Sequence, residues 1–148
     1  MQIFLAGSVS GADEKQLAKY GIYEKVLKPF GKVIAPKDID KFIVKCKKEK
    51  TTFSQKQLDK IIVEYDLTQV KTSELVVCDL TLNSTGVGIE LGVAKTNNIP
   101  VIFCYQKGTN ISTIVRGAFF DSTFIEYKNI EQLQEKLIEK ITKYFINK

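Results

Sequence analysis

Two carboxylates, Glu90 and Asp66, are the residues best suited to do chemistry in this chain. Glu90 lies in a glycine-rich stretch, STGVGIELGVA, whose apolar residues recur at helical spacing. Side chains in a helix lean toward its N-terminus, so Glu90 is expected to lie over Gly86, in space that the glycine leaves open. Asp66 lies one helical turn from both Ile62 and Val70, which places it at the edge of an apolar face.

Two carboxylates in unlike environments are the pattern of glycosidic bond cleavage, because one stays ionised while the other carries a proton. The positive end of a helix dipole favours the ionised form of Glu90, which suits a nucleophile or a charge stabiliser. Burial would raise the pKa of Asp66, which suits proton transfer. Each residue also has a simpler interpretation: Glu90 caps the first turn of its helix, or Asp66 pairs with a lysine.

An anion-binding site is predicted beside Glu90. Asn83 or Ser84 is a good helix N-cap. The amides of the next turn, including that of Gly86, point outward at the positive end of the helix dipole, where an anion fits.

A second glycine-containing loop, AGSVSG, spans residues 6–11. It resembles a phosphate loop but carries neither of the usual nucleotide-binding glycine motifs. The glycines, Gly7 and Gly11, predict a close approach of the backbone to a sugar or phosphate, with the hydroxyls of Ser8 and Ser10 as donors. A generic tight turn is the alternative.

Arg116 is the single arginine in a chain that otherwise uses lysine. A guanidinium provides bidentate geometry that lysine lacks, so Arg116 could hold a phosphate, a carboxylate or a neighbouring subunit. A chance surface position is the alternative.

The composition excludes several other kinds of site. The chain has no histidine, which rules out an imidazole base and disfavours a zinc site. Its three cysteines are widely spaced and are expected to pack in the core. The net charge of +5 comes from lysines, many of them in residues 41–56, where a solvated helical face is expected. No nucleic-acid module accompanies them, so a small anionic substrate is the expected partner and a nucleic acid is not.

Strand and helix signals alternate along the chain. Short apolar strands are expected at residues 2–6, 32–35, 74–80, 100–105 and 123–127, and the first helix at residues 12–30. This order predicts one domain over residues 1–148, with a Rossmann/flavodoxin-like, doubly wound five-stranded parallel sheet and helices on both faces. Ligands bind beyond the carboxyl ends of such strands, so residues 7–11, 79–90 and 106–116 should converge.

Four segments, taken in order, resemble one known family: FLAGSVSG, VEYDLTQVKTSELVVCDLT, STGVGIELGVA and ISTIVRGAF. Together they are similar to the 2'-deoxynucleoside 5'-phosphate N-hydrolases, of the nucleoside 2-deoxyribosyltransferase superfamily. The resemblance covers nearly the whole chain and is weakest at residues 38–53. It implies a Rossmann-like homodimer with shared active sites, which uses water to cleave the N-glycosidic bond of a nucleoside monophosphate. It implies no metal and no cofactor.

The resemblance also implies roles for individual residues. Glu90 matches the family's catalytic glutamate, which attacks or stabilises the anomeric carbon, and Asp66 matches the aspartate that handles the proton of the base or sugar. Further matches, all of them substrate contacts, are Ser84 and the Gly86 amide at the phosphate, Gly7 and Ser8 in the first loop, and Ser112, which the family contributes to the neighbouring subunit's phosphate site.

Two positions depart from the family pattern. Members specific for deoxynucleotides have tyrosine where this chain has Phe4, and related enzymes that cleave cytidine ribonucleotides have phenylalanine there. Phe4 cannot donate a hydrogen bond to the catalytic carboxylate, and it leaves more room near the sugar. Ser10 stands where the family usually has arginine. The base and the choice between ribose and deoxyribose therefore stay open.

Two other functions are compatible with the sequence. One is a nucleoside 2-deoxyribosyltransferase, which exchanges bases on unphosphorylated deoxynucleosides. The other is a non-catalytic domain that binds or senses a nucleotide. No apolar run approaches the ~20 residues of a membrane span, and the N-terminus lacks a basic signal region, so a cytoplasmic protein without membrane association is expected.

Overall fold

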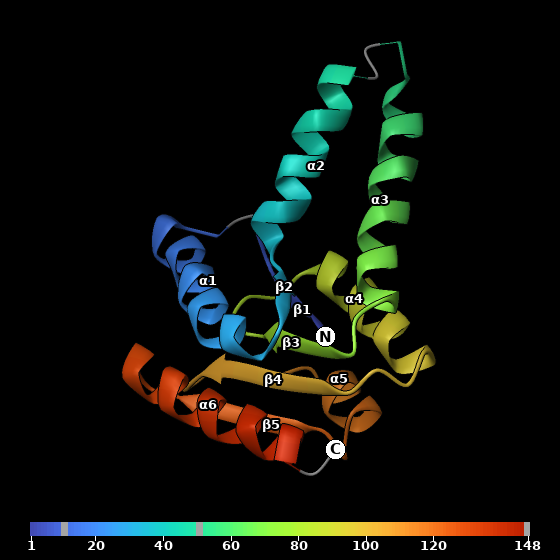
Figure 1. Cartoon of the computed structure of the whole chain (residues 1–148). Coiled ribbons are helices and arrows are strands. Elements are labelled where there is room, and N and C mark those ends of the chain that lie inside the picture. Colours follow the sequence, from blue (N-terminus) through green and yellow to red (C-terminus); the bar gives the residue numbers. More distant parts are fainter. Residues whose placement is uncertain (10–11, 50–51, 147–148) are drawn as a thin grey trace.

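The computed structural model describes residues 1–9, 12–49 and 52–146. Within these residues, five parallel strands form one sheet in the order β2-β1-β3-β4-β5 (Figure 1). The strands are β1 (Gln2–Gly7), β2 (Lys32–Ile34), β3 (Leu75–Asp79), β4 (Val101–Gln106) and β5 (Thr123–Tyr127). The predicted five-stranded parallel sheet is confirmed.

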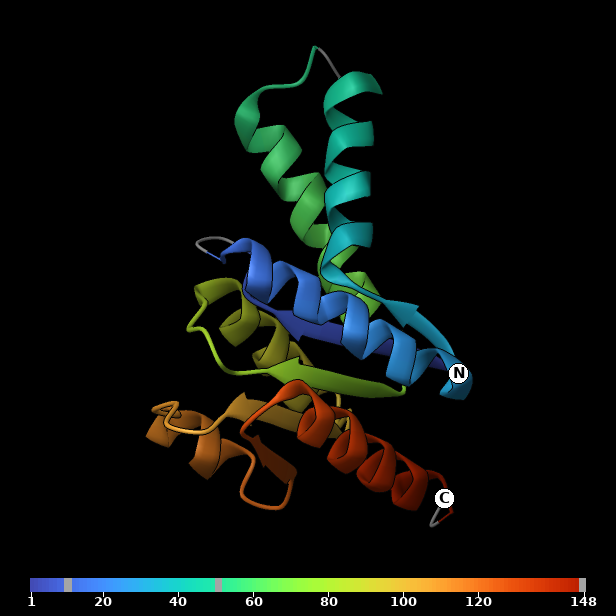
Figure 2. The ribbon, with the colours of Figure 1, turned by 90° about the vertical axis from the view of Figure 1, so that its left-hand side faces the viewer.

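Helices cover both faces of this sheet, as the sequence predicts. They are α1 (Glu14–Leu27), α2 (Pro36–Glu49), α3 (Gln55–Lys71), α4 (Thr85–Thr96), α5 (Thr113–Ala118) and α6 (Ile130–Ile146). Figure 2 shows α1 and α6 side by side on the face toward the viewer. The opposite face packs against α3, α4 and the end of α5, so the architecture is doubly wound.

The two faces of β1 show why its sequence is a continuous apolar run. Ile3 and Leu5 belong to the core beneath α1 and α6, whereas Phe4 and Ala6 belong to the core beneath α3 and α4. All four are buried, since successive side chains of a strand point to opposite sides and both sides are covered. The three cysteines are likewise free and buried, as predicted.

The first helix is shorter than the sequence predicts. It begins at Glu14 because the Asp13 carboxylate caps it, accepting a hydrogen bond from the Gln16 amide at 2.8 Å. It ends at Leu27, and a 3₁₀ turn of Lys28–Phe30 containing Pro29 follows in place of the expected last helical turn. Proline lacks the amide that would continue the α-helical pattern.

The segment rich in lysine contributes to α2 and to the start of α3, and these two helices pair in a hairpin that projects away from the sheet (Figures 1 and 2). The ring of Phe42 on α2 stacks on that of Tyr65 on α3, with centroids 3.7 Å apart. The lysines of α2 are exposed, which confirms the predicted solvated face. The base of this hairpin stands beside the carboxyl end of β1 and forms one wall of the cavity described next.

Candidate active site

A cavity of about 270 Å³ opens at the carboxyl end of β1, between the hairpin and the start of α4. Glu90 and Asp66 both line it, so the structure brings together the two carboxylates that the sequence singles out. The remaining lining residues come from the end of β1, the inner faces of α2 and α3, and the first turn of α4: Phe4, Leu5, Gly7, Val9, Pro36, Ile39, Asp40, Ile43, Ile62, Val63, Ser84, Gly86 and Val87.

Glu90 and Asp66 form one half-buried acidic pair. Burial raises the pKa of the Glu90 carboxyl from 4.5 to about 8, and the charge of Asp66 and a hydrogen bond between the two carboxyls add to this rise. Burial raises the pKa of Asp66 as well, although the hydrogen bond with Glu90 opposes that rise. None of the described residues donates a hydrogen bond to Glu90 Oε2, which is buried. A proton held between the two carboxyls relieves their repulsion, so the pair carries one proton at neutral pH.

This electrostatic arrangement corrects the prediction that Glu90 is the ionised member. The helix dipole acts mainly within the first turn, whereas Glu90 lies in the second turn after the N-cap residue Ser84. Burial and the neighbouring Asp66 therefore outweigh the dipole, and Glu90 is the member that holds the proton in the free protein.

Gly86 lies in open space at the start of α4. A methyl group added at Gly86 would meet only Ser84 Oγ, at 3.6 Å, and no side-chain atom of Glu90 lies within 4 Å of it. The space above Gly86 is thus part of the cavity, and the Glu90 side chain does not fill it. Because Gly86 has no side chain, the backbone of this turn is open toward the cavity. An anion in the cavity can therefore reach the Gly86 amide, as predicted for an anion site.

The start of α4 has the predicted geometry of an anion site. Ser84 is the N-cap residue, and its hydroxyl accepts a hydrogen bond from the Val87 amide at 3.4 Å. Both Ser84 and Gly86 line the cavity that holds Glu90. The positive end of the α4 dipole therefore opens onto the same space as the acidic pair.

The first loop contributes less than the sequence predicts. Gly7 lines the cavity, and a side chain there would overlap the ring of Tyr20. The Tyr20 hydroxyl donates a hydrogen bond to the Ser8 carbonyl at 2.8 Å, and Ser8 itself is only 2% exposed and does not line the cavity. The predicted Ser8 donor is thus turned into the protein. Ser10 and Gly11 lie outside the described residues.

Phe4, Ser112 and Arg116 fall in three different places. Phe4 is buried in β1 and lines the cavity. Ser112 lines a neighbouring cavity of about 330 Å³ on the other side of Ser84, and does not line the one that holds Glu90. Arg116 is exposed on α5 and lines neither, so this subunit does not bring it to the acidic pair.

One wall of the cavity was missed by sequence reasoning. Pro36, Ile39, Asp40 and Ile43 of α2 all line it. Their spacing of three and four residues marks one helical stripe, which could have been recognised, but the surrounding lysines suggested only a solvated helix.

A buried network beneath the carboxyl ends of β3 and β5 was also missed. Lys19 lies 2.8 Å from the Asp79 carboxylate, and both side chains are almost fully buried. Asp79 also accepts hydrogen bonds from the Tyr23 hydroxyl at 2.9 Å and the Thr81 amide at 2.8 Å. Lys19 and Tyr23 are one turn apart on α1, and an aspartate ends the apolar strand β3, so the signal was present in the sequence.

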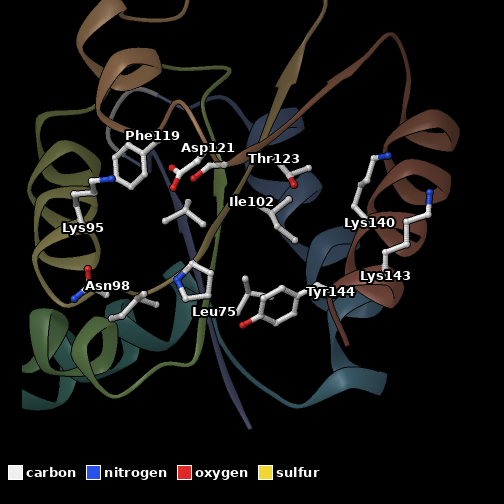
Figure 3. A pocket seen from close by; sticks show the side chains of 14 residues that line it. Leu75, Lys95, Asn98, Ile102, Phe119, Asp121, Thr123, Lys140, Lys143 and Tyr144 are labelled. Carbon is white, nitrogen blue, oxygen red and sulfur yellow. The ribbon is translucent and has the colours of Figure 1, made fainter. Parts of the chain in front are cut away.

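A larger cavity of about 590 Å³ lies at the other end of the strands (Figure 3). It is lined by Leu75 and Thr123, which begin β3 and β5, so it opens at the amino ends of the strands. Figure 3 shows Lys95 on one side of it and Lys140 on the other. In parallel α/β sheets ligands bind at the carboxyl ends, and this cavity contains no acidic pair, so the smaller cavity is the candidate active site.

Within the described residues, no group of three or more histidine, cysteine, aspartate or glutamate side chains is placed to hold a metal ion. None of the helices in the same part of the chain combines the length and the apolar character needed to cross a bilayer.

Comparison with known proteins places the chain in a family. It is 30% identical over 149 residues to the 5-hydroxymethyl-dUMP N-hydrolase of Danio rerio, covering 97% of this chain and 99% of that protein. A solved 2-deoxyribosyltransferase from Bacillus psychrosaccharolyticus has the same fold, with a TM-score of 0.66, 20% identity and 90% of each chain covered. The CMP N-glycosidase BcmB of Clostridium botulinum is similar in fold, with a TM-score of 0.63, 18% identity, and 93% of this chain and 97% of that chain covered.

No protein-family model matches the chain. The family is shown by the similarity to the Danio rerio enzyme, which extends over nearly the full length of both chains. The chain belongs to the 2'-deoxynucleoside 5'-phosphate N-hydrolase family, a group of N-glycosidases.

Proposed function

We propose that this enzyme hydrolyses the N-glycosidic bond of a nucleoside 5'-monophosphate, in particular a 2'-deoxynucleoside 5'-monophosphate. The products are the free base and ribose or deoxyribose 5-phosphate. The observation that carries the proposal is the half-buried pair of Glu90 and Asp66, which shares one cavity with the N-terminus of α4. The named activity of the Danio rerio relative supports the same reaction class.

In the proposed reaction, Glu90 and Asp66 exchange roles through the proton that they share. Glu90 passes its proton to Asp66 as substrate binds, and its carboxylate then attacks or stabilises the anomeric carbon. Asp66 gives the proton to the base, which leaves with the electrons of the broken bond. Water then adds to the anomeric carbon and returns one proton to the pair. Raised pKa values support this assignment, because at least one carboxyl must hold a proton at neutral pH.

The substrate phosphate is proposed to bind at the start of α4, to the Ser84 hydroxyl and the Gly86 amide. Support comes from the geometry: both residues line the cavity, and the helix dipole attracts an anion there. A neighbouring subunit is proposed to complete the phosphate site with its own Ser112, in a homodimer. The position of Ser112 outside its own subunit's cavity and the 80% exposure of the nearby Ile114 support this assembly.

A nucleoside 2-deoxyribosyltransferase is the nearest other activity, and the 5' phosphate distinguishes the two. An enzyme built around the anion site of α4 should lose most of its activity on an unphosphorylated nucleoside. It should also release free base without requiring a second base as acceptor. A non-catalytic nucleotide-binding domain would bind nucleotides without releasing any base.

The test is a panel of ribo- and deoxynucleoside monophosphates, with free base measured by chromatography. We expect release of base from at least one nucleotide, and its loss in Glu90→Ala. The matched control is Glu64→Ala, because Glu64 is an exposed glutamate of α3 outside the cavity. If no nucleotide is cleaved, or if Glu90→Ala cleaves as fast as the wild type, the proposed function is wrong.

The sugar specificity is tested at Phe4. Phe4 lines the cavity without a hydrogen-bond donor, which leaves room for a 2'-hydroxyl. Comparing ribo- and deoxynucleotides on the wild type and on Phe4→Tyr separates the two sugars. A variant that gains preference for deoxynucleotides would support a role of Phe4 at the sugar, whereas an unchanged ratio would exclude it.

A further inference from the structure

Asp40, on the hairpin wall, is the third carboxylate of the candidate active site. It lines the cavity together with Asp66 and Glu90 but comes from α2, the helix that faces them. Its neighbours on this wall are apolar, since Ile39 and Ile43 flank it at one-residue and three-residue spacing. A single charged group in an otherwise apolar wall is the arrangement that orients a ligand and gives specificity.

Asp40 makes no ion pair or hydrogen bond with any other described residue. The lysines beside it on α2 are engaged elsewhere: Lys37 pairs with Glu24, and Lys41 pairs with Asp38 at 3.4 Å. Asp40 is exposed to solvent and at the same time borders the cavity. Its oxygens are therefore available to a bound molecule.

If the protein has the proposed function, on which this inference rests, a bound nucleotide is oriented with its base against the hairpin wall. The phosphate is held at Ser84 and Gly86, and the anomeric carbon lies at Glu90. The lining that remains is that of the hairpin, with Ile62 and Val63 of α3 facing the stripe of α2. This space is apolar enough for the ring of a base, and Asp40 lies at its edge.

We propose that Asp40 is a specificity-determining residue that accepts a hydrogen bond from an exocyclic amino group of the base. An ionised carboxylate accepts hydrogen bonds and donates none. Cytosine presents an amino group at C4, and adenine presents one at C6. Uracil and hypoxanthine present a carbonyl oxygen at the corresponding position, where two acceptors would face each other. The enzyme therefore prefers nucleotides whose base carries an amino group.

Matched pairs of nucleotides test this preference, because each pair differs mainly at one exocyclic group. The pairs are CMP with UMP and AMP with IMP, each also as the deoxynucleotide, and kcat/KM is measured for each member. Asp40 is exposed to water, which competes for its oxygens, so we expect the wild type to prefer the amino member by no more than about tenfold. In Asp40→Asn the preference should fall to about threefold or less, because the amide can also donate to a carbonyl.

The control is Asp59→Asn on α3, an exposed aspartate that lies outside the cavity. It should keep the base preference of the wild type, and thermal unfolding of both variants checks that they are folded. Equal cleavage of both members by the wild type, or a preference that survives in Asp40→Asn, would overturn the role of Asp40 and leave the proposed function intact. Cleavage of none of these nucleotides would instead refute the proposed function, and the role of Asp40 with it.

Discussion

Asp66 on α3 and Glu90 on α4 lie side by side in one cavity, and burial raises the pKa of both carboxyls. The charge of Asp66 contributes to the raised pKa of Glu90, so the two groups do not titrate independently of each other. The pair is best regarded as a single unit that holds one proton over the neutral range. Its protonation state links the chemistry of this protein to its stability.

The pH dependence of activity follows from this pair. As the pH rises through about 8, the pair loses the proton that Glu90 holds, and none is left for the departing base. As the pH falls toward the raised pKa of Asp66, above its ordinary 3.8, both carboxyls become protonated and no nucleophile remains. We expect a bell-shaped profile of kcat/KM, which reports the free enzyme. A profile that keeps rising beyond pH 9 would contradict the shared proton.

Glu90 should also make the folded protein less stable as the pH rises. In the unfolded chain Glu90 loses its proton near 4.5, whereas in the folded protein it keeps the proton to about 8. Between these values the unfolded state binds fewer protons, so stability falls by up to about 1.4 kcal/mol per pH unit. Glu90→Gln removes this loss, and its advantage over the wild type should be larger at pH 8 than at pH 5.

Urea denaturation at the two pH values measures this effect. Glu64→Gln is the control, because its side chain is 64% exposed and pairs only with Lys60 on the surface. The same difference between Glu90→Gln and the wild type at both pH values would argue against a buried, protonated Glu90.

Ser84 should affect phosphate recognition beyond its role as a helix cap. Ser84→Ala removes the hydroxyl that caps α4, at a cost of about 1 kcal/mol, and with it the proposed phosphate contact. We expect kcat/KM for a nucleoside monophosphate to fall by about tenfold, with little change for the nucleoside. Ser54→Ala is a matched control, since Ser54 caps α3 and does not line the cavity. Equal losses on both substrates would point to a structural role alone.

The buried ion pair of Lys19 and Asp79 should be essential for stability. Lys19→Met leaves the Asp79 carboxylate buried without its cation, and we expect a loss of about 3–5 kcal/mol in the free energy of unfolding. Lys37→Met is the control, because the Lys37 side chain is 57% exposed and its ion pair should contribute less than about 1 kcal/mol. Addition of Asp79→Asn to Lys19→Met should recover part of the loss, and a double variant with no recovery would contradict the account.

The sequence alone predicted the parallel sheet, its five strands and the covering of both faces. These depend on local patterns: continuous apolar runs mark strands such as β1, and helical spacing marks the helices between them. The same spacing identified Asp66 and Glu90 as candidate catalytic residues and Ser84 as the cap of α4, because each argument needs only neighbours within one or two turns. The capping of α1 by Asp13 and the 3₁₀ turn after it are local too, but helix ends are less sharply marked by pattern.

Only the tertiary structure decided the protonation of these residues and their access to the cavity. Glu90 holds the proton because distant segments bury it and place Asp66 against it, and a sequence does not reveal the burial of a side chain on a half-apolar helix. Ser8 is buried, with its carbonyl bonded to the Tyr20 hydroxyl, and Asp40 lines the cavity because the base of the hairpin stands beside the carboxyl end of β1. Protonation and access depend on desolvation by groups far apart in the chain, so they are properties of the packed molecule and not of any one segment.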